Sequence, residues 1–119
     1  MSVRITGLNR ALTRLARLPA AAREARDEVL EQWAEDTQDT AKNLVPERTG
    51  NLNNAIDKRV FSDAAYVGVY KPDELEYAEY VEKGTSSMEE QPYLVPAFEA
   101  NRADVARNFR AAIRRRTGA

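Results

Sequence analysis

The residue types that most often carry out chemistry are unevenly represented in this chain. It has neither cysteine nor histidine, so a Cys–His or Ser–His nucleophile cannot form within it, and the commonest general base and metal ligand are missing. Glu28, Glu31 and Glu35 are spaced to share one face of a helix. A di-iron site built on such carboxylates also needs histidine, and the five glycines are too scattered to form a phosphate-binding loop. We therefore expect no catalytic site, metal or cofactor.

Acidic and basic side chains are gathered into separate blocks. Acids without any base occupy 27–41, and seven acids against one lysine occupy 73–90. Six arginines lie in 1–26 and six more in 99–119. Solvated helix faces would explain any single block, whereas complementary patches on one molecule would suit head-to-tail contacts between copies. The net charge is only −1, and both interpretations remain open.

Apolar residues recur at helical spacing in several parts of the chain. Leucines three or four positions apart predict a short helix at 6–18, within an N-terminal segment 1–18 that could be mobile. A longer helix is expected at 20–44, because Pro46 pushes the residue before it out of helical geometry. A short helix at 75–83 should end at Gly84. A last helix is expected at 96–115, with a flexible tail at 115–119.

Two stretches alternate as strands do. Leu52, Ile56 and Val60 share one side of a strand predicted at 52–61, and a second strand at 65–70 would complete a hairpin. With helices packed on one face of this antiparallel sheet, the chain is predicted to be a single α+β domain spanning 1–119. The predicted core consists of Trp33, Leu44, Val67, Val69, Phe98, Val105 and Phe109.

Candidate contact residues come from the charged blocks, the tyrosines and the polar stretch 84–92. We expect this stretch to be a mobile loop that orders on docking, with Met88 as its one apolar anchor. The arginines near the C-terminus could neutralise phosphates, contact a subunit or remain solvated. The candidate subunit or partner interface comprises Glu28, Glu31, Glu35, Tyr80, Glu82, Met88, Arg107, Arg110 and Arg114.

Five short motifs follow one another in a fixed order. They are Ala-Lys-Asn-Leu-Val-Pro at 41–46, Arg-Thr-Gly-Asn-Leu at 48–52, Val-Gly-Val at 67–69, Tyr-Ala-Glu-Tyr-Val-Glu-Lys-Gly-Thr at 77–85 and Gln-Pro-Tyr-Leu-Val-Pro-Ala at 91–97. Together they resemble the lambdoid phage gene-product-ten family of tail components over nearly the whole chain. The chain departs from the family pattern at Asn53, where a basic residue is frequent, and at Lys83, where an aromatic residue often precedes the glycine.

The resemblance implies a non-enzymatic virion protein that forms a ring, expected to be hexameric, at the head-proximal end of the tail. Its implied partners are copies of itself, a tail terminator or tail tube protein, and a head–tail connector or head-completion protein. The arginine-rich C-terminus could add a passing contact with packaged DNA. The matching motif residues are of types that form turns and cap helices, so we interpret them as structural residues. They are Pro46, Thr49, Gly50, Leu52, Tyr77, Ala78, Glu82, Gly84, Thr85, Pro92 and Pro96.

The location and the alternative function follow from simpler features. No apolar run approaches the roughly 20 residues of a membrane span, and the N-terminus lacks the apolar stretch of a signal peptide. We therefore expect the host cytoplasm during assembly and the virion neck afterwards, with no membrane or small-molecule partner. The alternative is a small nucleic-acid-binding accessory protein that uses its arginine-rich termini.

Overall fold

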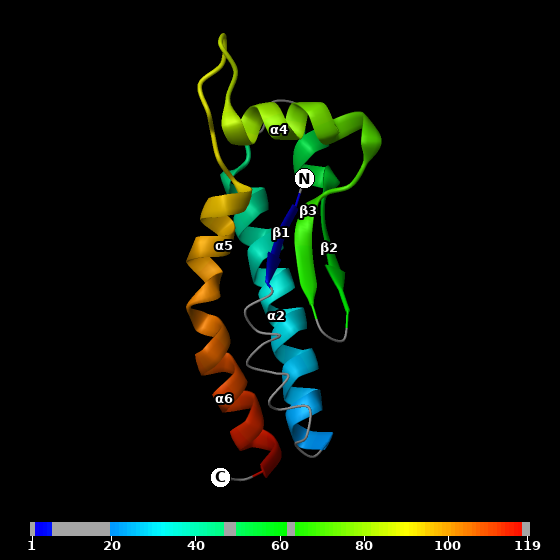
Figure 1. Ribbon diagram of the computed structural model, residues 1–119, viewed down its shortest axis with the longest axis vertical. Coiled ribbons are helices and arrows are strands. Elements are labelled where there is room, and N and C mark those ends of the chain that lie inside the picture. Colours follow the sequence, from blue (N-terminus) through cyan, green and yellow to red (C-terminus); the bar gives the residue numbers. More distant parts are fainter. Residues whose placement is uncertain (1, 6–19, 47–49, 62–63, 118–119) are drawn as a thin grey trace.

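The computed structural model describes residues 2–5, 20–46, 50–61 and 64–117, and shows an elongated α+β molecule measuring 54 × 21 × 21 Å (Figure 1). The elements are β1 (Ser2–Ile5), α2 (Ala20–Leu44), α3 (Asn51–Ala55), β2 (Ile56–Val60), β3 (Ala65–Val69), the short 3-10 turn η1 (Pro72–Glu74), α4 (Leu75–Lys83), α5 (Leu94–Arg102) and α6 (Asp104–Thr117). Helices α2, α5 and α6 follow the long axis, and α4 crosses one end. The α+β prediction is confirmed.

Helix α2 is the central element, and its predicted range of 20–44 is confirmed. Small and apolar residues three and four positions apart make a stripe that packs on both the sheet and the C-terminal helices. Leu44 does not belong to the core as predicted, because its side chain is 45% exposed. The chain leaves helical geometry before Pro46, and Val45 turns inward in its place, with 3% exposure.

The sheet has three antiparallel strands in the order β1-β3-β2. Its inner face carries Val67, Val69 and Ile56, which are buried against α2. Strand β1 is not among the elements that the sequence predicts: within the N-terminal segment 1–18, residues 2–5 pair with β3, with Val3 opposite Val67. The predicted helix at 6–18 lies outside the described residues.

The strand predicted at 52–61 is wrong in its first half. Gly50 has φ 75°, and the chain then makes the short helix α3 before β2 begins at Ile56. Asn53 explains why this stretch is helical rather than extended, because its side-chain amide donates to the carbonyl of Lys42 at 2.7 Å. That carbonyl lies in the last turn of α2, where the helix has no partner for it. The spacing of four between Leu52 and Ile56 suits a helix as well as a strand.

The C-terminal segment forms two consecutive helices instead of the single predicted one. Helix α5 begins at Leu94, two residues before the predicted start, and α6 follows after Ala103. The expected flexible tail at 115–119 is helical as far as Thr117, and residues 118–119 lie outside the described residues.

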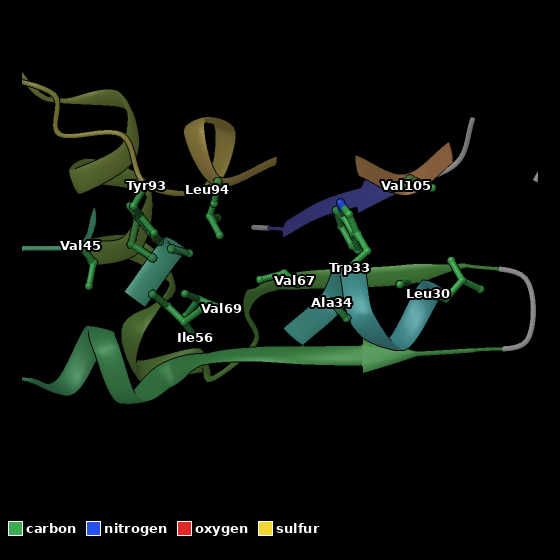
Figure 2. Packing of buried hydrophobic residues seen from close by; sticks show 14 of the residues in the cluster. Leu30, Trp33, Ala34, Val45, Ile56, Val67, Val69, Tyr93, Leu94 and Val105 are labelled. Atoms are coloured by element: carbon green, nitrogen blue, oxygen red, sulfur yellow. The ribbon is translucent and has the colours of Figure 1, made fainter. Parts of the chain in front are cut away.

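One apolar cluster joins the described elements (Figure 2). Trp33 of α2 meets Phe98 of α5 edge to face, with ring centroids 6.0 Å apart. Val105 is buried as predicted, whereas Phe98 and Phe109 are half-buried at the margin of the cluster.

Candidate partner interface

Among the described residues, no group of three or more carboxylates is gathered closely enough to hold a metal ion. No helix in the same part of the chain is long and apolar enough to cross a membrane. The candidate residues differ in whether the fold leaves them on a surface that can contact other molecules.

Glu82 closes the corner between α4 and α5 and is only 6% exposed. Its carboxylate accepts the backbone N–H groups of Tyr93 at 3.0 Å, Leu94 at 2.8 Å and Val95 at 3.3 Å. These are among the first N–H groups of α5, which lack partners within the helix, and the helix dipole favours a negative charge there. Glu82 therefore joins two helices of its own subunit, which fits its prediction as a structural motif residue better than its place among the candidate interface residues.

Tyr93 lies beside this carboxylate and is fully buried. Its hydroxyl donates to the carbonyl of Ala78 at 3.2 Å. Burial, and secondarily the charge of Glu82, raise the pKa of Tyr93 far above the usual tyrosine value. Tyr93 is missing from the predicted core list, although it stands within the motif at 91–97.

The segment 84–92 is tied to its own subunit at several points. Gly84 has φ 77°, and a Cβ there would stand 2.8 Å from the nitrogen of Glu90. The backbone N–H of Thr85 donates to the carbonyl of Met88 at 2.8 Å. Met88 is half-buried and packs against the core. It also lines an apolar pocket of about 240 Å³ together with Pro46 and Tyr77. Met88 is thus an internal contact in this structure.

The acidic and basic blocks partly neutralise each other within the chain. Glu28 of α2 lies 2.6 Å from Arg115 and 3.2 Å from Arg116 of α6, and Glu24 lies 3.4 Å from Arg116. The hydrogen bond from Arg115 is the main cause that lowers the pKa of Glu28. From the sequence, solvated helix faces and contacts between copies were both open for these blocks. For these residues the contact is internal, made between side chains 87 positions apart.

Other candidates remain on the surface. Glu31 pairs with Lys58 of β2 at 3.2 Å, while Glu35 is exposed and has no ion pair with any described residue. On α6, Arg107 contacts Asp104 at 2.7 Å. Arg110 and Arg114 are exposed and contact no described carboxylate. These two arginines are the part of the C-terminal block that stays available to a partner.

The outer face of the sheet, opposite α2, carries a basic and aromatic surface that sequence reasoning missed. Arg4, Tyr66 and Arg59 form a row across β1, β3 and β2. The guanidinium of Arg4 lies 5.9 Å from the ring centroid of Tyr66, and that of Arg59 lies 3.9 Å from the ring centroid of Tyr70. Phe61, which is 54% exposed, packs edge to face on Tyr66. The alternation of side chains along β2 and β3 places Arg59 and Tyr66 on one face. The row could not be recognised from the sequence, because β1, which contributes Arg4, was not predicted.

The exposed face of α4 has the opposite charge. Glu76 and Glu79 are exposed there, and Lys83 offsets part of their charge through a 3.4 Å contact with Glu79. Tyr80 is 41% exposed and Leu75 is 37% exposed. The Tyr80 hydroxyl donates to Glu76, and this hydrogen bond is the main cause that raises the pKa of Tyr80. Tyr80 is therefore on the surface, where a partner could reach it.

Comparison with known proteins gives one match. The family model of bacteriophage HK97-gp10-like tail components matches residues 8–84. This stretch includes α2, α3, β2, β3 and α4 and ends at Gly84, whereas β1, α5 and α6 lie outside it. Neither a curated protein nor a solved structure matches the chain significantly.

Proposed function

The chain belongs to the HK97-gp10-like family and is a bacteriophage tail component, and from this premise we propose that it is a non-enzymatic ring subunit at the head-proximal end of the tail that helps to join tail to head. The proposed partners are copies of itself, with a hexameric ring as the expected assembly. A tail terminator or tail tube protein would lie on one side of the ring. A connector or head-completion protein would lie on the other.

The observation that carries this proposal is the distribution of exposed charge along an elongated subunit. Helix α4 lies at one end of the long axis, and α6 runs toward the other end (Figure 1). The exposed carboxylates of Glu76 and Glu79 belong to α4, and the exposed Arg110 and Arg114 belong to α6. Two ends of different chemistry suit a ring that must bind a different neighbour on each side, because complementary charge sets orientation as well as rate of encounter.

Passing contact with packaged DNA is part of the proposal and rests on those two arginines. Side chains without a carboxylate partner can approach phosphates without first breaking an ion pair. A free-standing nucleic-acid-binding role remains the alternative. A mobility-shift measurement at physiological salt separates the two, since the ring subunit should not bind duplex DNA tightly as an isolated protein.

The decisive test is a phage that carries a nonsense mutation in this gene. Electron microscopy of the lysate should show filled heads and complete tails that are not joined. Adding the purified protein to that lysate should restore infectious particles, and adding a denatured sample should not. Joined particles in the mutant lysate would exclude the proposed role. Labelled antibody on wild-type virions should mark the neck, and a signal along the tail shaft would place the protein elsewhere.

The polar stretch 84–92 supports a narrower proposal, namely that it contacts the tail tube or the next subunit. Ser86, Ser87, Glu89 and Glu90 are exposed at the end of the molecule where α4 lies. Replacing 86–90 by a glycine–serine segment should reduce head–tail joining while the circular dichroism spectrum stays unchanged. Because this replacement also removes Met88, the single variant Met88→Ser is the control for lost core packing. Normal joining by the replaced chain would show that the stretch is a plain connector.

A further inference from the structure

The outer face of the sheet carries Arg4 and Arg59, and it also carries the exposed carboxylate of Asp57, which lies opposite Gly68 on the same face as Arg59. Arg4 and Arg59 are exposed, and neither makes an ion pair with a described carboxylate. The guanidinium of Arg59 stacks on Tyr70 at 3.9 Å from the ring centroid, while that of Arg4 lies 5.9 Å from the ring centroid of Tyr66. Stacking orients a guanidinium while leaving its N–H edge free, and that edge matches the two oxygens of a carboxylate. The outer face of the sheet is therefore suited to binding an acidic partner.

No described helix covers this face. Helices α2 and α5 contact the sheet, and the side chains buried by these contacts are those of the inner face. Helix α4 lies beyond the end of the sheet, so a subunit does not place α4 on its own outer face (Figure 1).

The exposed face of α4 has the complementary chemistry. It offers the carboxylates of Glu76 and Glu79 at a spacing of three, which puts them on one side of the helix. It also offers Tyr80, 41% exposed, and Leu75, 37% exposed. Tyrosine and arginine are among the residues enriched at the centres of protein interfaces, and tyrosine buries a large area there at a low cost in conformational entropy.

We propose that α4 of one copy packs on the outer face of the sheet of the next copy, with Glu76 and Glu79 against Arg4 and Arg59, and with Tyr80 against Tyr66. This inference rests on the proposed ring function. Since the two surfaces differ, the contact is heterologous, and repeating it closes a ring when the rotation between copies permits. The arginines of α6 are a weaker match for α4, because Arg110 and Arg114 have no exposed aromatic side chain beside them among the described residues of that helix.

Cross-linking tests the contact directly, because the natural chain has no cysteine. The double variant Arg59→Cys/Glu79→Cys, assembled into tails, is treated with a short bismaleimide. A ladder of covalent oligomers that ends at the ring size is expected. Mixing the two single variants should stop the ladder at dimers. The control pair Arg110→Cys/Glu79→Cys should not cross-link. Strong cross-linking of the control pair, or none between positions 59 and 79 in joined particles, would overturn the proposal.

Charge exchange supplies an independent readout. Arg59→Glu and Glu79→Arg should each reduce head–tail joining about tenfold or more, as expected for losing a paired charge at an interface. The combined variant should recover most of the activity, which a merely structural role for either residue would not produce. Circular dichroism and the fluorescence of Trp33 verify the fold. Failure of the combined variant to recover would count against the pairing.

The remaining outcomes separate this inference from the proposed function and from a nucleic-acid role. Cross-links between positions 59 and 79 in a protein that never reaches the virion neck would support the contact and refute the head–tail role. Binding of a labelled single-stranded oligonucleotide that Arg59→Glu abolishes, without cross-links, would assign the face to nucleic acid and overturn the proposal.

Discussion

Replacing Glu82 by alanine should destabilise the protein more than any other single change at a charged residue of α4. The carboxylate accepts three backbone N–H groups, two of them at 3.0 Å or less, and the residue is 6% exposed. Hydrogen bonds to a charged group contribute about 1.5–3 kcal/mol each. Loss of a single helix cap costs about 0.5–2 kcal/mol. The three bonds share one acceptor group, so their contributions do not add fully.

We therefore expect Glu82→Ala to lower the free energy of unfolding by about 3–5 kcal/mol, a large share of the roughly 5–15 kcal/mol of a typical domain. Glu82→Gln keeps the length and one acceptor oxygen, but its amide nitrogen cannot accept a bond and the charge is lost. Its cost should be smaller, about 1–3 kcal/mol. The expected order of stability is wild type, then glutamine, then alanine.

Urea unfolding followed by the fluorescence of Trp33 is the appropriate assay. Trp33 is the only tryptophan, is 3% exposed, and contacts Phe98 of α5, so its emission reports the packing of that helix. The matched control is Glu79→Ala, one turn earlier on α4, where an exposed ion pair is worth at most about 1 kcal/mol. Equal midpoints for Glu82→Ala and Glu79→Ala would refute the capping argument.

Three further predictions follow from the same structure. Gly84→Ala should lower the free energy of unfolding in urea more than Gly50→Ala. Both glycines have positive φ, which costs about 1–2 kcal/mol for alanine, but only at Gly84 does the new Cβ meet backbone, at 2.8 Å. Equal losses of stability in the two variants would contradict this. Tyr93→Phe should cost about 1 kcal/mol at neutral pH. Because the pKa of Tyr93 is raised in the folded state, the contribution of its hydroxyl to stability is complete below the unfolded pKa of about 10 and declines as pH rises above it. A difference in free energy of unfolding between wild type and variant that stayed constant up to high pH would be the contrary result. Glu28→Gln should cost less than about 1 kcal/mol at low salt and still less at high salt, because the ion pairs with the two arginines are exposed. Since the pKa of Glu28 is lowered in the folded state, the difference in stability between wild type and Glu28→Gln should be present above the unfolded pKa of 4.5 and vanish as pH falls through the folded pKa. A difference that persisted in acid would show that another interaction is responsible.

The elements that sequence reasoning predicted to the residue are those with local start and stop signals. Helix α2 ends where Pro46 requires, and α4 ends at Gly84, whose positive φ few other residues adopt. The stretch around Leu52 was wrong because a spacing of four fits both a helix and a strand. The hydrogen bond from Asn53 to α2 decided between them, and it joins positions 11 residues apart. Exposure of Leu44 likewise depends on where α2 ends relative to the sheet.

The sequence by itself determined the absence of histidine and cysteine chemistry, the α+β class and the order of the family motifs, because each depends on composition or on neighbours along the chain. Tertiary structure alone decided the use of the charged side chains. It paired Glu28 with the C-terminal arginines, buried Glu82 beneath α5, and brought Arg4 into a row with Arg59. The energy of a charge depends on what lies within a few ångströms of it and on how much water remains, and only the folded chain brings distant segments that close.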